Sequence, residues 1–171
     1  MRTATCSPSE PLPDGTNLRV LRPSRKKPAD GDVFVMQLLD GRFVFGRVVR
    51  ADLPRERAPM PGSYLVYIYD AVSGAKSAPA GLSRDRLLIP PTFINRLPWT
   101  KGYFETIDHQ AIRPDDLLRQ HCFRRWTGDY LDEEGNKLPA PVEPCGEWGL
   151  TNYMMLADLV SDAIGIPRAP E

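Results

Sequence analysis

The 171-residue chain contains few of the residues from which catalytic and metal sites are usually built. It has two histidines, His109 and His121, and three cysteines, Cys6, Cys122 and Cys145. It has no phosphate-binding Gly-x-x-x-x-Gly-Lys-Ser/Thr loop, no Gly-x-Ser-x-Gly elbow and no His-Glu-x-x-His motif. With so few histidines, few acid-base or metal-binding arrangements can be assembled. We therefore expect no catalysis, no cofactor and no metal.

The histidines and cysteines still allow two specific alternatives. His121 and Cys122, joined by Cys145 and His109, could form a zinc site, and Cys122 with His121 could form a Cys-His nucleophile pair. Neighbours in a strand point to opposite faces, which argues against both. We expect Cys122 to be a buried structural residue. The odd number of cysteines, without metal-ligand spacing, also argues against a disulfide framework.

Long hydrophobic runs are also missing. No apolar stretch approaches the roughly 18 residues of a membrane span, and residues 1–14 are interrupted by three prolines where a signal peptide would have its apolar core. We therefore expect a cytoplasmic protein without a membrane partner. Lys plus Arg and Asp plus Glu each number 22, so the neutral total gives no general case for nucleic acid as a partner.

What the sequence does contain is a clear β-hairpin. The runs 33–38 and 43–49 are rich in β-branched and aromatic residues and flank Asp40-Gly41, a pair that favours tight hairpin turns. Both faces of these strands are largely apolar, so we expect the sheet to be covered on both sides. Gly46, in the middle of the second strand, predicts a bulge or a sharp bend.

Several shorter segments also have the composition of strands. These segments are 63–69, 87–89, 103–107, 121–126 and 129–131. Pro114, followed by two aspartates, predicts a short helix that ends near Gln120, because proline fits a first helical turn and carboxylates complement the helix dipole.

The clearest helix lies at the end of the chain. Its apolar residues recur at helical spacing: Tyr153, Leu156, Leu159, Val160, Ala163 and Ile164. Thr151 or Asn152 can serve as N-cap, and Gly165 followed by Pro167 predicts the end. The spacing predicts an amphipathic helix of about thirteen residues whose apolar stripe covers one face of the sheet.

Together these elements predict an α+β fold that is mostly β. Short strands with long connections favour a strongly bent antiparallel sheet or an SH3-like half-barrel, with the C-terminal helix packed on it. Residues 1–27 are proline-rich and lack periodicity, which predicts a flexible tail before a single domain at 28–171. Alternatively, Leu18, Val20 and Leu21 form a short strand that docks on the domain.

The sequence contains Gly31-Asp32-Val33-Phe34, the Asp40-Gly41 turn and Phe45-Gly46-Arg47-Val48, followed in order by the segments 88–91, 98–104 and 148–153. This ordered series resembles the Immunity protein 26 family, small bacterial proteins thought to neutralise toxins of polymorphic toxin systems. The resemblance spans about residues 28–167. It implies an immunity protein that binds a cognate toxin stoichiometrically and performs no chemistry.

An excess of acid marks the last quarter of the chain. Residues 129–171 carry nine acidic and two basic side chains, a net charge of minus seven. The candidate partner-binding residues are Asp132, Glu133, Glu134, Glu143 and Glu147. Such a patch would steer association with a basic partner, for example a toxic nuclease whose groove it covers. The alternatives are a solvated turn and the paired acids of a glycosidase.

Three tryptophans, Trp99, Trp126 and Trp148, would be interface anchors if exposed and core residues if buried. We expect the Pro-Trp-Thr-Lys-Gly segment that contains Trp99 to be a loop, so Trp99 is the tryptophan that we expect to be exposed. Two other functions remain open. One is an SH3-like binding module for a peptide or nucleic acid. The other is an unrecognised small hydrolase, which would require a concave polar pocket.

Overall fold

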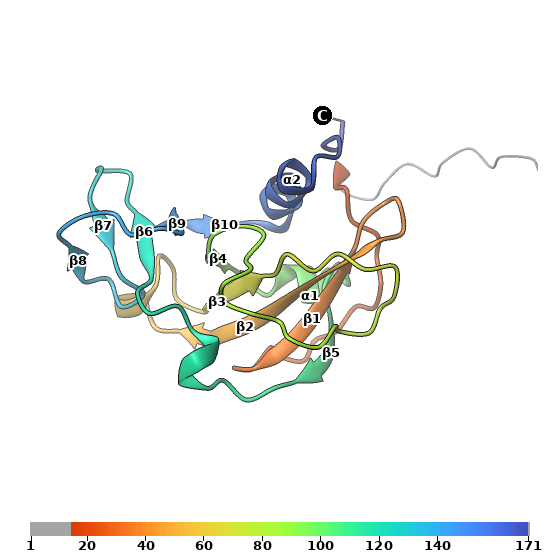
Figure 1. Ribbon diagram of the computed structural model, residues 1–171, viewed down its shortest axis with the longest axis horizontal. Coiled ribbons are helices and arrows are strands. Elements are labelled where there is room, and N and C mark those ends of the chain that lie inside the picture. Colours follow the sequence, from red (N-terminus) through yellow and green to blue (C-terminus); the bar gives the residue numbers. More distant parts are fainter. Residues whose placement is uncertain (1–14, 171) are drawn as a thin grey trace, which may run out of the picture.

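The computed structural model describes residues 15–170, whose strands form two open sheets (Figure 1). In spatial order the large sheet consists of β10 (Leu150–Thr151), β4 (Thr92–Ile94), β3 (Ser63–Ile68), β2 (Phe43–Leu53), β1 (Asp32–Gln37) and β5 (Glu105–His109). The small sheet consists of β8 (Lys137–Leu138), β7 (Tyr130–Leu131), β6 (Cys122–Arg124) and β9 (Cys145–Glu147). The predicted α+β, mostly β class is confirmed. The described strands do not close into a barrel.

Two α-helices and two 3₁₀ turns complete the described structure. They are α1 (Leu97–Lys101), α2 (Tyr153–Ile164), η2 (Arg55–Arg57) and η3 (Pro114–Asp116). Paired strands are antiparallel except β10 with β4 and β6 with β9. No helix among residues 15–170 combines the length and the hydropathy required to cross a membrane.

The predicted hairpin is β1 and β2, which pair with Phe34 opposite Gly46. A Cβ atom on Gly46 would lie 2.3 Å from Cζ of Phe34, so the glycine makes room for the aromatic ring. The bulge expected at Gly46 is instead found further along β2, where the register against β3 shifts after Val48. The prediction misplaced the bulge because Gly46 is required for a different reason, which is to make room for the Phe34 ring on the paired strand.

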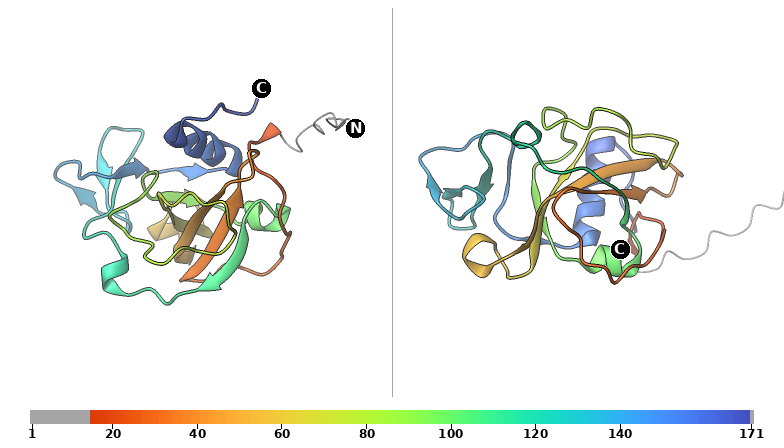
Figure 2. Two further views of the ribbon diagram at one scale, coloured as in Figure 1. Left: turned by 45° about the vertical axis from the view of Figure 1, so that its right-hand side comes forward. Right: turned by 90° about the horizontal axis from the view of Figure 1, so that it is seen from below.

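Both faces of the large sheet are covered, as its two-sided hydrophobicity predicted. On one face, Phe34 and Val66 share a core with α1 and α2. On the other, Tyr67 and Phe93 pack with Phe123 of the small sheet. Figures 1 and 2 show α2 lying over one side of the large sheet, while β6 to β9 form a lobe beyond its β4 and β10 end.

Helix α2 begins and ends where the sequence predicts. The side chain of Asn152 accepts a hydrogen bond from the Met155 amide at 2.8 Å, and Gly165 adopts a left-handed φ of 83°. Leu156 and Val160 are fully buried, but Leu159 is 43% exposed. The central place predicted for Leu159 in the buried stripe is therefore wrong.

Two short elements differ from the prediction. Segment 87–89 forms only an isolated bridge between Leu87 and Tyr69, and the strand itself is β4, which begins directly after Pro90-Pro91. The helix expected from Pro114 to Gln120 is a single 3₁₀ turn, η3. Both elements were mispredicted because local propensity is a weak signal in such short segments, where tertiary contacts determine the backbone conformation.

The described part of the expected tail packs on the domain. Leu18 is fully buried and bridges Leu38, and the Leu21 amide donates to the Gly102 carbonyl at 2.7 Å. The described residues before 28 therefore contact β1 and α1, through an isolated bridge at Leu18 rather than the strand of the alternative prediction. Residues 1–14 of the expected tail lie outside the described residues.

Candidate partner-binding surface

The five acidic candidates all belong to the small sheet and its connections. Asp132, Glu133 and Glu134 lie on the turn between β7 and β8, Glu143 precedes β9, and Glu147 ends it. The fold therefore places the predicted acidic residues on one lobe of the molecule. Their individual contacts, however, give them different roles.

Asp132 organises its own turn. Its Oδ1 accepts hydrogen bonds from the amides of Glu134 and Asn136, both at 2.9 Å, and its Oδ2 accepts from the Asn136 side chain at 3.2 Å. This is the usual way in which an aspartate stabilises a turn through nearby backbone amides. Most of the acceptor capacity of Asp132 is thus used within the chain.

Glu133 and Glu134 join the two sheets. Arg50 of β2 lies 3.7 Å from Glu133 and 3.6 Å from Glu134, and Arg57 lies 3.8 Å from Glu134. The His121 imidazole, 3.3 Å from Glu133, is the main cause that lowers the pKa of this carboxyl below its ordinary value. Both glutamates are therefore engaged with cations of the same chain.

Glu143 and Glu147 are the candidates that remain available to a partner. Both are exposed, and neither forms an ion pair within residues 15–170. Glu147 lies opposite Arg124 in the register of β9 and β6, so the two side chains share the outer face of the small sheet. Glu143 accepts a hydrogen bond from the Cys145 amide at 3.2 Å.

A shallow groove runs beside Glu143. Two adjoining hollows, of about 410 and 450 Å³, share the lining residues Arg84, Asp85, Leu118 and Glu143. Val142, 38% exposed, adds an apolar contribution to this wall. The groove is therefore lined by charged side chains of both signs and by apolar side chains.

The prediction for Trp99 is wrong. Trp99 lies in α1, is only 2% exposed and packs against Phe34 and Phe104 with ring centroids 5.0 Å apart. Its segment was expected to be a loop, but it forms the short helix that covers the large sheet. Trp99 is a core residue and is not available as an interface anchor.

The exposed tryptophan is Trp126, whose exposed fraction of 91% is the largest among the large hydrophobic residues described. It lies on the turn between β6 and β7. Arg125 braces this turn, because its Nε donates to Asp129 at 3.0 Å while its amide donates to the Asp129 carbonyl at 2.8 Å. The Arg125 guanidinium and Thr127 hydroxyl hold the pKa of Asp129 well below its usual range. Sequence reasoning had no signal that separated Trp126 from Trp99.

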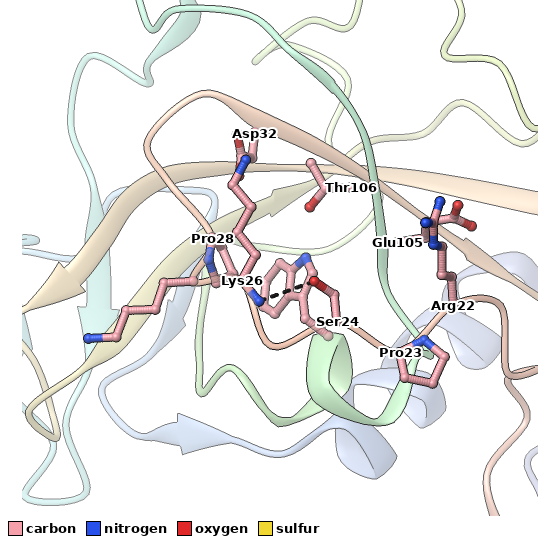
Figure 3. Close-up of a pocket in the computed structure, with 10 residues that line it drawn as sticks. Arg22, Pro23, Ser24, Lys26, Pro28, Asp32, Glu105 and Thr106 are labelled. Atoms are coloured by element: carbon pink, nitrogen blue, oxygen red, sulfur yellow. Dashed lines mark hydrogen bonds between the residues drawn. The ribbon is translucent and has the colours of Figure 1, made fainter.

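A separate hollow of about 310 Å³ lies where the N-terminal segment crosses β5 (Figure 3). Arg22 and Lys26 line it together with Asp32 and Glu105. Asp32 accepts from the Ala29 amide and contacts His109 Nδ1, both at 2.9 Å, while Glu105 pairs with Lys76 outside the lining.

This hollow bears on the hydrolase alternative. The Asp32–His109 contact has the carboxylate-to-Nδ1 arrangement of a catalytic dyad. Within the described residues, however, no serine, threonine or cysteine hydrogen-bonds His109, and Ser24 Oγ accepts from the Lys26 amide at 3.2 Å. The arrangement lacks an activated nucleophile.

The second histidine is held in a buried network. Tyr67 Oη lies 2.5 Å from His121 Nε2, and the carboxylate of Glu133 contacts the other ring nitrogen, Nδ1. Cys122 does not contact His121 but faces Cys145, with the two Sγ atoms 3.0 Å apart. Cys122 is fully buried, as expected. Residues 15–170 contain no group of three His, Cys, Asp or Glu side chains suited to a metal ion.

Comparison with known proteins gives one positive finding. A family model described as Immunity protein 26 matches residues 29–130, from three residues before β1 to the first residue of β7. Comparisons with curated proteins and with solved structures found no match. The match covers more than half of the chain and includes the hairpin and the segments 88–91 and 98–104, on which the resemblance partly rested. The chain therefore belongs to the Immunity protein 26 family.

Proposed function

We propose that this chain is an immunity protein that binds a cognate toxin through the outer surface of its small sheet. The observation that carries the proposal is the almost complete exposure of Trp126 on a braced turn. Tryptophan is the residue most enriched among interface hot spots, and a side chain held by a rigid turn loses little entropy on binding. Family membership supports a toxin as the partner.

The acids give this surface its electrostatic character. Glu143 and Glu147 are exposed and lie on the same lobe as Trp126. Such charges increase the rate of association with a basic partner more than they increase affinity. A nuclease with a basic substrate groove is therefore the class of toxin that suits this surface best. Covering that groove would exclude the nucleic acid and inhibit the toxin without any chemistry.

The affinity test uses the toxin encoded beside this gene, purified and titrated calorimetrically with the immunity protein. We expect binding to saturate near one equivalent. Trp126→Ala should weaken binding by about 30-fold or more, as for an interface hot spot. Met155→Ala is the matched control, because Met155 is 53% exposed on α2, outside the small sheet. Equal affinity of the wild type and the Trp126 variant would remove this surface as the interface.

The kinetic test addresses charge. Glu143→Lys combined with Glu147→Lys should slow association and weaken its dependence on salt, whereas Asp115→Lys, an exposed acid in η3, should change neither. Stopped-flow association at several salt concentrations measures both quantities. Inactivation of the toxin by substoichiometric protein would contradict the binding mechanism and indicate an enzyme.

A further inference from the structure

The two cysteines of the small sheet are placed for covalent bond formation. Cys122 of β6 and Cys145 of β9 are direct partners in the parallel register. Neighbouring strands lie about 4.7 to 4.9 Å apart, which falls within the Cα separation of about 4.4 to 6.8 Å that disulfides span. The two Sγ atoms are 3.0 Å apart, so about 1 Å of movement would bring them to the bond length of about 2.05 Å.

We propose that Cys122 and Cys145 form a reversible thiol-disulfide modification site whose substrate is a low-molecular-weight disulfide. In the first exchange the Cys145 thiolate attacks one sulfur of the small disulfide. A mixed disulfide forms, and one small thiol leaves with the proton that Cys145 lost. In the second exchange the Cys122 thiolate attacks the Cys145 sulfur and expels the second small thiol. In total the chain loses two protons and two electrons, and the small disulfide gains them as it becomes two thiols.

The order of the two exchanges follows from burial. Cys145 is partly exposed, whereas Cys122 is fully buried, so only Cys145 can meet a reagent from solution. Cys122 then resolves the mixed disulfide from within the sheet. The Val142 amide lies 3.4 Å from Cys122 Sγ and donates toward it, which helps to hold this sulfur in position beside Cys145.

The surroundings of Cys145 determine the rate of the first exchange. Burial is the main cause that raises its pKa above the ordinary value, followed by the Cys122 thiol and then by the carboxylates of Glu143 and Glu147. Few thiolates form at neutral pH, so the first exchange is slow there. As long as the pH stays below that pKa, the rate of the first exchange should rise about tenfold for each unit by which the pH increases. Glu143→Gln with Glu147→Gln should accelerate it.

The bond would tie the edge strand β9 to β6 at Cys145, the residue that directly follows the groove-lining segment 142–144. Among the described strands, β9 pairs only with β6, so the cross-link would reinforce its single connection. Formation of the bond does not depend on the proposed toxin binding. The two proposals therefore fail independently.

The experiment uses the full chain carrying Cys6→Ser, incubated with oxidised glutathione at pH 8.5. We expect both remaining thiols to disappear without a retained glutathione, and dithiothreitol to restore them. Intact mass spectrometry and thiol titration under denaturing conditions measure this. The melting temperature should rise by about 5 to 10 °C, because the bond closes a loop of some two dozen residues.

Single-cysteine variants identify each role. With Cys122→Ser the protein should keep one glutathione on Cys145, because no resolving thiol remains. With Cys145→Ser it should take up none, because Cys122 is buried. Two free thiols persisting in the Cys6→Ser protein, or a disulfide that joins two chains, would overturn the proposal. This decisive measurement requires no substitution in the core.

Discussion

His121 shows how one buried side chain can join distant segments. The Leu118 amide donates to the Tyr67 hydroxyl at 3.0 Å, and that hydroxyl contacts His121 Nε2 at 2.5 Å. The other ring nitrogen faces Glu133 at 3.3 Å. Burial raises the pKa of Tyr67 to about 12, so its hydroxyl stays protonated beside the imidazole. His121 thereby connects β3 to the turn between β7 and β8.

The role of Glu133 in this network predicts a pH-dependent contribution to stability. Its folded-state pKa lies below the ordinary value of 4.5, so its contribution is complete above that pH and is lost as the pH falls through the folded-state pKa. Glu133→Gln should lower the free energy of unfolding by about 1 to 3 kcal/mol at pH 7.

Urea unfolding at pH 7 and at pH 3 measures this difference. The difference in stability between the two proteins should be smaller at the acidic pH, because protonation of Glu133 removes the charge that glutamine lacks at either pH. Glu143→Gln, at an exposed position, is the control and should change stability by less than about 0.5 kcal/mol at either pH. An equal loss for Glu133→Gln at both pH values would show that charge is not the cause.

At the scale of elements, the helical spacing of apolar residues predicts that α2 forms, but tertiary packing determines which of these residues are buried. The apolar residues predict the helix itself, and Leu156 and Leu159 both fit its stripe. Only Leu156 is buried. Ser161 takes a place on the buried face, where its hydroxyl accepts a hydrogen bond from the Asn17 side chain at 2.9 Å. This contact with a residue 144 positions earlier helps to fix the rotation of the helix.

Two leucine substitutions in α2 test this rotation. Leu156→Ala should lower the free energy of unfolding by about 2 to 5 kcal/mol, because it leaves a cavity between the helix and the sheet. Leu159→Ala, identical in chemistry, should cost less than about 1 kcal/mol at its 43% exposed position. Chemical denaturation of the two variants provides the comparison. Similar costs at both positions would mean that the helix is rotated differently in solution.

At the scale of the molecule, the two sheets share one interior. Phe93 of β4 and Phe123 of β6 have ring centroids 4.6 Å apart, and Trp148 lies 5.2 Å from Phe93. The contacts of Arg50 with Glu133 and Glu134 close the same junction from outside. The small sheet is thus anchored by aromatic packing, while Arg124 and Glu147 on its outer face stay exposed.

This junction predicts cooperative unfolding. Phe123→Ala should lower the free energy of unfolding by about 3 to 5 kcal/mol, and amide protection should fall together in both sheets. Hydrogen exchange resolved by peptide measures protection in each sheet. Trp126→Ala is the control, because it removes an exposed aromatic ring of the same lobe. Loss of protection confined to β6–β9 would show that the small sheet unfolds alone.

The sequence by itself determined the features that depend on local pattern. Alternating residues around Asp40-Gly41 specify the hairpin, and the cap and stop residues of α2 specify its ends. The ordered phrases also indicated the Immunity protein 26 family, which the family match shows. Each of these signals lies within a few residues of chain, where backbone geometry and hydrogen bonding are set by near neighbours.

Tertiary structure alone decided which side chains are available. Trp99 and Trp126 are equally apolar, yet α1 packs one into the core while the β6–β7 turn exposes the other. Glu133 and Glu147 carry the same charge, but only Glu133 meets Arg50. Cys122 and Cys145 approach each other through the pairing of β6 with β9. These outcomes depend on contacts between residues far apart in the chain, which no local pattern encodes.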